Sequence, residues 1–269
     1  MRFDLASITD QGGRRRNEDR LALIEHRRLF AGVVADGAGG HGGGDVAAQL
    51  VVDTVSAALR ECAGRGDGMQ STLLTDALIA ANEAIVKAQA AGGALARMRS
   101  TAAVLAIDPL SGHAIWAHCG DTRIYCFRRG HTAFQTIDHS MVQQLVDANL
   151  LAPREMRRHP LRNLLLAALG TEDALPVQVA AAPFAIADGD VFLVCSDGLW
   201  EHIDESAMID AIGHADDAES WLTTLAARVK RAAPPRADNL SAVAIWAGAP
   251  REATVLERAA RKNTQTAKQ

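Results

Sequence analysis

The segment LFAGVVADG, residues 29–37, decides the fold prediction. Its first seven residues are mostly apolar, which is typical of a buried β-strand. The strand ends at Asp36, and a glycine-rich loop follows over residues 37–44. We expect Asp45 to cap a helix that runs from Val46 to about Glu61.

Outward from this segment, periodic apolar stretches alternate with turn sequences. A second long helix is expected over Ser71–Ala91. Short turns join three apolar segments, Thr101–Ile107, His113–Gly120 and Arg123–Arg128, which favours an antiparallel meander. Further helices are expected at His139–Leu150, Glu205–Ile212 and Ala218–Ala232, and further strands at Val191–Cys195 and Leu240–Trp246. Helices grouped between antiparallel strands predict an α+β fold of two sheets with helices packed outside them.

The composition is that of an ordinary globular protein. The 269 residues are 48% hydrophobic and 22% charged, which fits one large domain. The formal net charge of -4 argues against a general binder of nucleic acid or of anionic membranes. The first 19 residues hold no signal-peptide stretch, and no window of about 18 residues is apolar and uncharged. We therefore predict a chain that spans no membrane.

Four cysteines are present, and no two of them form the Cys-x-x-Cys pair of zinc or redox sites. Four cysteines in a chain of this length do not indicate a disulfide framework. We interpret them as reduced, mostly buried thiols, which favours a cytoplasmic location. They are Cys62, Cys119, Cys126 and Cys195.

Aspartates recur at the ends of the predicted strands. Asp36, Asp121 and Asp197 each follow a strand, and Asp238 precedes the last one. Because the end of one antiparallel strand lies beside the start of its neighbour, we expect Asp36, Asp197 and Asp238 to converge on one rim. Each residue alone has a simpler interpretation as a turn or loop residue. Their joint occurrence at strand ends is what favours a shared site.

Clustered carboxylates repel one another unless cations neutralise them. Oxygen ligands favour hard ions such as magnesium or manganese, and two such ions can activate a shared water for attack on a phosphate ester. Gly37 would leave room for its backbone carbonyl to act as a further ligand, and Gly198 would let the chain turn sharply away. The sequence therefore predicts a phosphoryl-transfer site with two metals.

A charged run, Arg14 to Asp19, lies near the start of the chain. The Arg14 guanidinium could grip two phosphate oxygens, and Glu18 and Asp19 could hold waters bound to a metal. On composition alone, a solvated charged loop is the alternative interpretation. The glycines of residues 39–44 lack the Gly-Lys-Ser/Thr ending of a nucleotide-binding loop, so that reading is discounted.

Taken in order, these motifs resemble the metal-dependent (type 2C) serine/threonine protein phosphatases in their bacterial form. The resemblance runs from about Asp4 to Trp246. Its pieces are Gly13-Arg14, Asn17-Glu18-Asp19, residues 34–41 (VADGAGGH), Ser100-Thr101-Ala102, Gly120-Asp121-Thr122-Arg123, Asp138-His139-Ser140, His159-Pro160 with Asn163, Ala168-Leu169-Gly170, Ser196-Asp197-Gly198-Leu199 and Asp238-Asn239-Leu240-Ser241.

The resemblance implies a four-layer α-β-β-α sandwich and an enzyme that hydrolyses phosphoserine and phosphothreonine esters through a hydroxide bridging two metals. Asp36 would bridge two manganese or magnesium ions, with the Gly37 carbonyl on one of them. Asp197 and Asp238 would complete the second, and Asp121 resembles the ligand of a third, weaker metal. Two further roles are implied: Glu18 and Asp19 would hold a metal directly or through water, and Arg14 would bind the substrate phosphate.

This sequence departs from the family pattern at several positions. Ala38 stands where animal relatives have a histidine proposed as general acid, so the proton donor for the leaving group is unassigned. His41 lies nearby but is shifted, and we expect it to stabilise its loop. Ala167 stands where bacterial relatives often have arginine, and Arg99 replaces a glycine. Both changes would alter substrate contacts.

The resemblance also implies partners and boundaries. We expect a phosphatase domain over residues 1–249 and a flexible, weakly basic tail over residues 250–269. The expected partners are phosphorylated proteins, including a bacterial serine/threonine kinase and its substrates, and the expected state is a monomer. Two rivals stay open: a metal-dependent hydrolase of small phosphate esters, and a binding module without activity.

Overall fold

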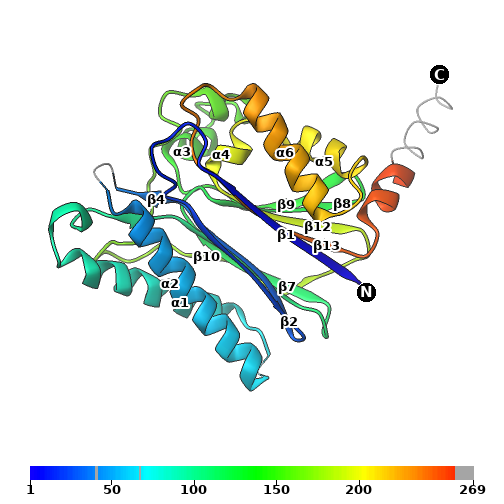
Figure 1. The fold of residues 1–269 in the computed structure, drawn as a ribbon, viewed down its shortest axis with the longest axis horizontal. Helices are drawn as coiled ribbons and strands as arrows, with labels where there is room; N and C mark the ends of the chain where they lie inside the picture. Colours follow the sequence, from blue (N-terminus) through cyan, green and yellow to red (C-terminus); the bar gives the residue numbers. More distant parts are fainter. Residues whose placement is uncertain (40–41, 67, 258–269) are drawn as a thin grey trace.

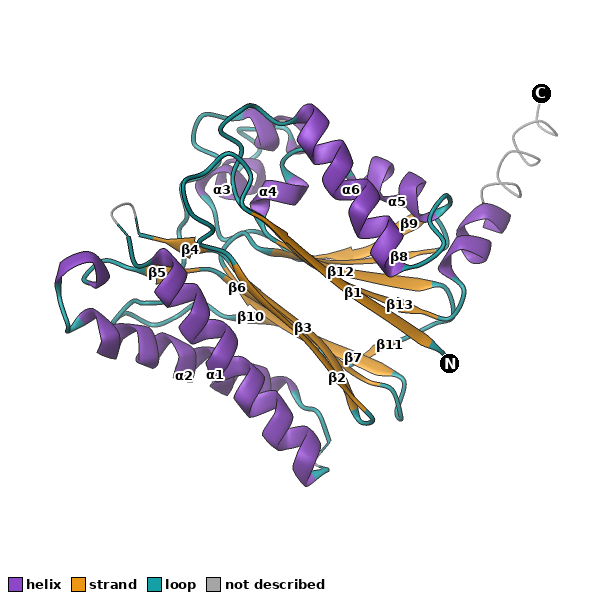
Figure 2. Ribbon diagram, in the orientation of Figure 1, coloured by secondary structure: helices purple, strands orange, loops and turns teal. Residues whose placement is uncertain are grey.

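A computed structural model describes residues 1–39, 42–66 and 68–257 of the chain. Two antiparallel sheets face each other, and helices cover the outer face of each sheet (Figure 1). The colouring by secondary structure shows these four layers directly: a layer of helices, a sheet, a second sheet and a further layer of helices (Figure 2). This is the predicted α+β sandwich, and the prediction is confirmed.

The first sheet has the strand order β1-β13-β12-β8-β9. Its strands are β1 (Phe3–Asp10), β13 (Leu240–Ala247), β12 (Asp190–Cys195), β8 (Arg123–Arg128) and β9 (His131–Gln135). In the pairing of β12 with β13, Cys195 lies opposite Ala242, so the end of β12 lies beside the start of β13. This register brings the residues after Cys195 close to those before Leu240.

The second sheet has the order β10-β7-β6-β3-β2, and β11 also pairs with β7. Its strands are β2 (Arg20–His26), β3 (Leu29–Ala35), β6 (Ala102–Asp108), β7 (His113–Cys119), β10 (Gln178–Val179) and β11 (Phe184–Ala185). A small ladder of β4 (Gly37–Ala38) and β5 (Arg99–Ser100) continues beyond the end of β3. The predicted buried strand is β3, whose residues are all buried except Phe30.

The helices belong to two groups. Helices α1 (Gly44–Arg65) and α2 (Ser71–Gln89) cover the second sheet, and α4 (Asp197–Trp200), α5 (Glu205–Ile212) and α6 (Ala218–Ala232) cover the first sheet (Figure 1). The short elements η1 (Gly93–Leu95), α3 (Met141–Asp147) and η2 (Pro153–Arg158) lie in the connections.

Apolar residues fill the three spaces between the four layers. One cluster joins α1 and α2 to the second sheet, one lies between the sheets, and one joins α4, α5 and α6 to the first sheet. The cluster between the sheets includes Val34, Phe192 and Val243. Burial of this apolar surface stabilises the sandwich and fixes the two sheets relative to each other.

Local capping explains why two helices begin where predicted. The Asp204 carboxylate accepts from the Ala207 N–H at the start of α5, and Asp217 accepts from the Ser220 N–H at the start of α6. The prediction for α1 was wrong at its start. Gly43 is the N-cap, with φ of 94°, and Asp45 lies inside the first turn, where its charge favours the helix dipole.

The predicted three-stranded meander was also wrong. Strands β6 and β7 pair as expected, but β8 crosses to the first sheet and pairs with β12 and β9. The crossing takes place at Gly120, where φ is 105°, and Asp121 follows it. A turn between two apolar segments therefore joins the two sheets and does not close a hairpin.

Strands β1 and β2 were not predicted, because each mixes charged and half-buried residues without a clear apolar run. In the first part of the predicted tail, residues 250–257 are helical and Thr254 is buried. The last residues of the tail, 258–269, lie outside the described residues. Among the described residues, no helix is long and apolar enough to cross a bilayer.

Candidate active site

A cavity of about 700 Å³ opens at the end of the sandwich where the aspartates follow their strands. Both sheets and the N-terminal loop contribute to its wall. The lining residues are Arg14, Arg15, Arg16, Glu18, Asp36, Gly37, Ala38, Gly39, Gly42, Thr101, Asp121, Asn163, Leu165, Asp197, Asp238 and Asn239. Of the predicted site residues, only Asp19 is missing from this wall, and it is buried beside it.

Asp36 follows β3 in the second sheet, and its backbone is held on both sides. Its N–H donates to Thr101 Oγ1 over 3.0 Å, and its carbonyl accepts from the Thr101 N–H over 2.8 Å. Gly37 comes next because no side chain fits there: a Cβ would lie 2.1 Å from the Gly44 carbonyl oxygen. The sequence analysis gave Gly37 the role of leaving its carbonyl free to bind a metal. The structure gives a further reason for the glycine, which is the close approach of the start of α1.

Asp197 and Asp238 come from the first sheet. Asp197 begins α4 two residues after β12, and Asp238 lies two residues before β13. Between them, a Cβ on Gly198 would lie 2.0 Å from the Asn239 carbonyl oxygen. Gly198 is therefore required for the close contact of two chain segments; the structure gives no sharp turn there, because Gly198 lies within α4.

Asn239 fixes the N-terminal loop against this end of the sheet. Its amide Nδ2 donates to the carbonyls of Gln11 and Arg16 over 2.7 and 2.9 Å, and its Oδ1 accepts from the Glu18 N–H over 2.8 Å. The loop is thereby held with Arg14 and Glu18 facing the cavity. The sequence motif contained Asn239, but its hydrogen bonds to a segment more than 200 residues away had no local signal.

Asp19 lies beneath the cavity wall and is 2% exposed. Ser196 Oγ donates to one oxygen, Oδ2, over 2.8 Å. The other oxygen, Oδ1, is buried and has no hydrogen-bond partner among the described residues, and the same holds for Asp197 Oδ1. A buried carboxylate oxygen without a donor is costly, so both atoms indicate a missing positive charge.

The carboxylates also raise one another's pKa. Burial is the largest cause for Asp36 and Asp197, and it places the pKa of each well above the usual range, with neighbouring aspartates adding to the effect. Burial raises the pKa of Asp19 to about 6 and that of Asp121 to about 7. For Glu18, burial and then the charge of Asp45 raise the pKa. Buried carboxylates that raise one another's pKa in this way are typical of functional sites, and a bound cation would relieve their repulsion.

The donor set fits hard divalent cations, since it consists of carboxylates and backbone carbonyls. As the side chains stand, no three His, Cys, Asp or Glu residues within the described ranges converge closely enough to hold an ion. The carboxylate of Asp238 is instead paired with the Arg14 guanidinium, which is half exposed. The two buried carboxylate oxygens without donors are the observation that favours a metal here.

Other predicted residues lie apart from the cavity or beyond description. His41 falls outside the described residues. His159 lines a separate pocket, with Glu201 and His202. Neither Arg99 nor Ala167 is among the described residues that line the site cavity.

Sequence reasoning also missed two contributors to the site. It quoted Thr101 only as part of a motif, although its hydroxyl and N–H bond the Asp36 backbone. It gave no role to Trp200, whose indole N–H donates to the Asp121 carbonyl over 3.0 Å. Both act through backbone atoms, which leave no pattern in a single sequence.

Comparisons with known proteins agree with this geometry. A family model described as protein phosphatase 2C matches residues 13–242. A serine/threonine phosphatase stp of Listeria welshimeri is 32% identical over 209 residues, which are 76% of this chain and 81% of that protein.

Two solved structures are also similar. The catalytic domain of the serine/threonine protein phosphatase PstP, in complex with two manganese ions, has a TM-score of 0.74 at 28% identity and covers 90% of this chain and 97% of its own. PppA, a key regulatory component of T6SS in Pseudomonas aeruginosa, has a TM-score of 0.72 at 30% identity, with coverage of 91% and 97%. This chain therefore belongs to the protein phosphatase 2C family, and it is a metal-dependent serine/threonine protein phosphatase.

Proposed function

We propose that the cavity is the catalytic centre of this phosphatase, and that Asp36, Asp197 and Asp238 hold two divalent cations there. Manganese or magnesium fits the oxygen donors. The observation that carries the proposal is the burial of carboxylates from both sheets around one cavity of about 700 Å³, with Asp197 Oδ1 lacking a partner among the described residues. A third, weaker cation would bind at Asp121.

When bound, the two cations would lower the pKa of a shared water and neutralise charge that builds on the phosphoryl group. Asp36, which follows β3, lines the same cavity as Asp197 and Asp238, and their charges raise its pKa, so it is the residue suited to bridging. The Gly37 carbonyl would add a ligand on the β4 side. Glu18 and Asp19 would hold a cation directly or through water.

Arg14 would bind the phosphate of the substrate. Its side chain is 51% exposed at the cavity wall, and its only ion pair within the described residues is with Asp238. Release of Asp238 to a cation would free the guanidinium to donate two parallel hydrogen bonds to phosphate oxygens. Ala38 offers no proton, so another group must supply the proton of the leaving hydroxyl.

The substrates we propose are phosphorylated proteins that include a bacterial serine/threonine kinase and its targets. The relatives are serine/threonine phosphatases, which supports the substrate class. We further propose a monomer that works in the cytoplasm and a catalytic domain over residues 1–249. The buried thiols of all four cysteines are compatible with a reducing compartment.

The test is hydrolysis of para-nitrophenyl phosphate with manganese by wild type and by Asp36→Ala. We expect metal-dependent turnover in wild type and a loss of about 100-fold or more in the variant, since the carboxylate would touch the reacting centre. Asp76→Ala, at an exposed aspartate of α2, is the matched control and should keep full activity. An inert wild type, or an Asp36→Ala variant with full activity, would refute the proposal.

A second assay defines the substrate class. Turnover of a phosphothreonine peptide should exceed turnover of nucleotides and small phosphate esters at equal concentration. The opposite order would favour the rival function, a hydrolase of small esters, while leaving the metal centre intact.

A further inference from the structure

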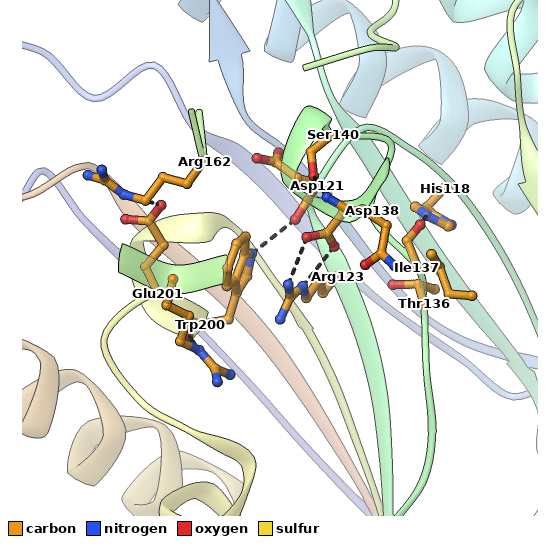
Figure 3. A network of polar contacts seen from close by, with 12 residues as sticks. His118, Asp121, Arg123, Thr136, Ile137, Asp138, Ser140, Arg162, Trp200 and Glu201 are labelled. Carbon is orange, nitrogen blue, oxygen red and sulfur yellow. Dashed lines mark hydrogen bonds and ion pairs between the residues drawn. The ribbon is translucent and has the colours of Figure 1, made fainter. Parts of the chain in front are cut away.

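Trp200 contacts Asp121, in the wall of the cavity, and also the segment of residues 157–165, the end of which lines the cavity. It is the last residue of α4, the short helix that begins with Asp197, and it is 2% exposed. Figure 3 shows its indole between Asp121 on one side and Glu201 with Arg162 on the other. The residue is therefore connected to Asp121, one of the proposed cation ligands, and to Arg157, without being among the described residues that line the cavity.

The first connection is a hydrogen bond to the Asp121 backbone. The indole Nε1–H donates to the Asp121 carbonyl over 3.0 Å (Figure 3). The same turn is held from behind by His139, whose N–H donates to the Gly120 carbonyl over 2.9 Å and whose Nδ1 accepts from the Gly120 N–H. These contacts fix the peptide groups that aim the Asp121 side chain.

The indole is itself held in place by a buried cation. The Arg123 guanidinium lies 3.5 Å from the Trp200 ring centroid, and it donates two hydrogen bonds of 2.7 Å to the Asp138 carboxylate (Figure 3). Arg123 and Asp138 are both almost fully buried. A planar guanidinium that is fixed by a bidentate partner provides a rigid surface for an aromatic ring.

The second connection reaches the segment at the cavity edge. Arg157, in η2, donates from Nε to the Trp200 carbonyl over 2.8 Å and from Nη2 to Glu205 over 2.7 Å. Next to Trp200 in sequence, Glu201 forms an ion pair of 2.9 Å with Arg162. Asn163 and Leu165, which follow closely, line the cavity itself.

We propose that Trp200 is a positioning residue for Asp121, held by Arg123 from the core and by Arg157 from the segment at the cavity edge. This inference rests on the proposed role of Asp121 as ligand of a third, weaker cation. Partners that orient a metal ligand commonly change metal affinity about 10-fold to 100-fold when they are removed. Through the indole hydrogen bond, Trp200 would orient Asp121 and so change its affinity for the cation.

The experiment removes this hydrogen bond and keeps an aromatic ring. Free manganese is measured by electron paramagnetic resonance during titration of the metal-free wild type, Trp200→Phe and Asp121→Ala. We expect Asp121→Ala to lose the weakest class of site. We expect Trp200→Phe to weaken that class about tenfold and to leave the two tighter ions unchanged.

Trp221→Phe is the matched control. Trp221 is also buried, and its indole N–H also donates to a backbone carbonyl, that of Met208, over 3.1 Å. Its substitution costs the same kind of hydrogen bond in α6, away from the cavity. Both tryptophan variants should therefore show a similar fall in melting temperature, whereas only Trp200→Phe should shift manganese binding.

Two outcomes would overturn the inference. If Trp200→Phe binds manganese at every class of site with wild-type affinity while Asp121→Ala loses one class of site, Trp200 does not position Asp121. If Asp121→Ala itself loses no site, Asp121 is not a metal ligand and the inference falls with it. Neither outcome touches the test of the catalytic centre, which depends on Asp36→Ala and para-nitrophenyl phosphate.

Discussion

A buried aspartate lies at or near each end of strand β12, and the two differ in the partners that the chain provides for their carboxylates. Asp190 begins the strand and has no exposed surface, and Arg128 donates to its two oxygens over 2.6 and 2.7 Å. The Ala187 N–H adds a third hydrogen bond of 2.8 Å. Asp197 lies two residues beyond the other end of the strand, is 8% exposed, and has one oxygen without a partner among the described residues.

Under the proposed function, the difference separates a structural carboxylate, Asp190, from a metal-binding one, Asp197. At Asp190 the chain supplies the compensating charge, so folding leaves nothing unpaired. At Asp197, burial and then the charges of neighbouring carboxylates raise the pKa well above its usual range, and the structure records no ion pair for this side chain within the described residues. We infer that a bound cation, and not a side chain of the protein, compensates the carboxylate charge at this end of β12.

The largest expected effect comes from removing the counter-ion at the structural end. Arg128→Met would leave the buried Asp190 charge uncompensated and should lower the free energy of unfolding by about 3 kcal/mol, with or without manganese. Urea denaturation followed by circular dichroism measures it. Arg60→Met, at an exposed arginine of α1, is the control and should change stability by less than about 0.5 kcal/mol. An Arg128→Met variant as stable as the control would mean that Asp190 does not depend on its ion pair.

A smaller effect is expected at the functional end. Asp197→Asn removes one of several repelling carboxylates, so the metal-free protein should keep its stability or gain about 1 kcal/mol. The variant should lose most of the stabilisation that manganese gives wild type, which is about 2.7 kcal/mol at 100 times the dissociation constant. Unfolding in EDTA and in manganese measures both quantities.

The same substitution at the other end provides the control. Asp190→Asn leaves the Arg128 guanidinium without its carboxylate and should destabilise the protein equally in EDTA and in manganese. If Asp197→Asn instead destabilises the metal-free protein as Asp190→Asn does, the two ends of β12 are alike and the comparison fails.

Local signals explain how far the sequence could predict the fold. Helices α5 and α6 match their predicted bounds because Asp204 and Asp217 cap them within three residues. The crossing of β8 to the other sheet was missed, because the turn before Arg123 is compatible with a hairpin and only packing between distant segments decides otherwise. Strand pairing is a property of the whole chain, so such errors concentrate there.

The candidate site shows the same division between residues with a local sequence signal and residues whose role depends on distant contacts. Asp36, Asp197 and Asp238 could be predicted because their place at strand ends has a sequence signature, and the cavity brings them together. Trp200 could not, because it acts through one hydrogen bond to a backbone atom 79 residues away. A side chain that holds a ligand's backbone is recognised only in three dimensions.

The smallest expected effect is a pH dependence confined to the metal-free protein. The raised pKa of Asp121, about 7, means that the folded chain holds protons that unfolded carboxyl groups release near pH 4. Because the folded state then binds more protons, stability should fall as pH rises, by about 1 kcal/mol between pH 6.5 and 7.5. His118, whose pKa burial lowers to about 4, acts in the opposite direction by about 0.3 kcal/mol over this interval, because the unfolded imidazole still releases protons above pH 6.5. The pKa values of Asp36 and Asp197, which burial raises well above the usual range, add to the fall and keep its sign.

Urea unfolding in EDTA at the two pH values measures this slope, and a saturating concentration of manganese should abolish it, since bound cations would replace the protons. Arg128→Met should keep the slope despite its lower stability, because it acts at the other end of β12. A metal-free protein whose stability is flat or rises over this interval would show that the carboxylates of the functional end are already neutralised by the chain, as Asp190 is.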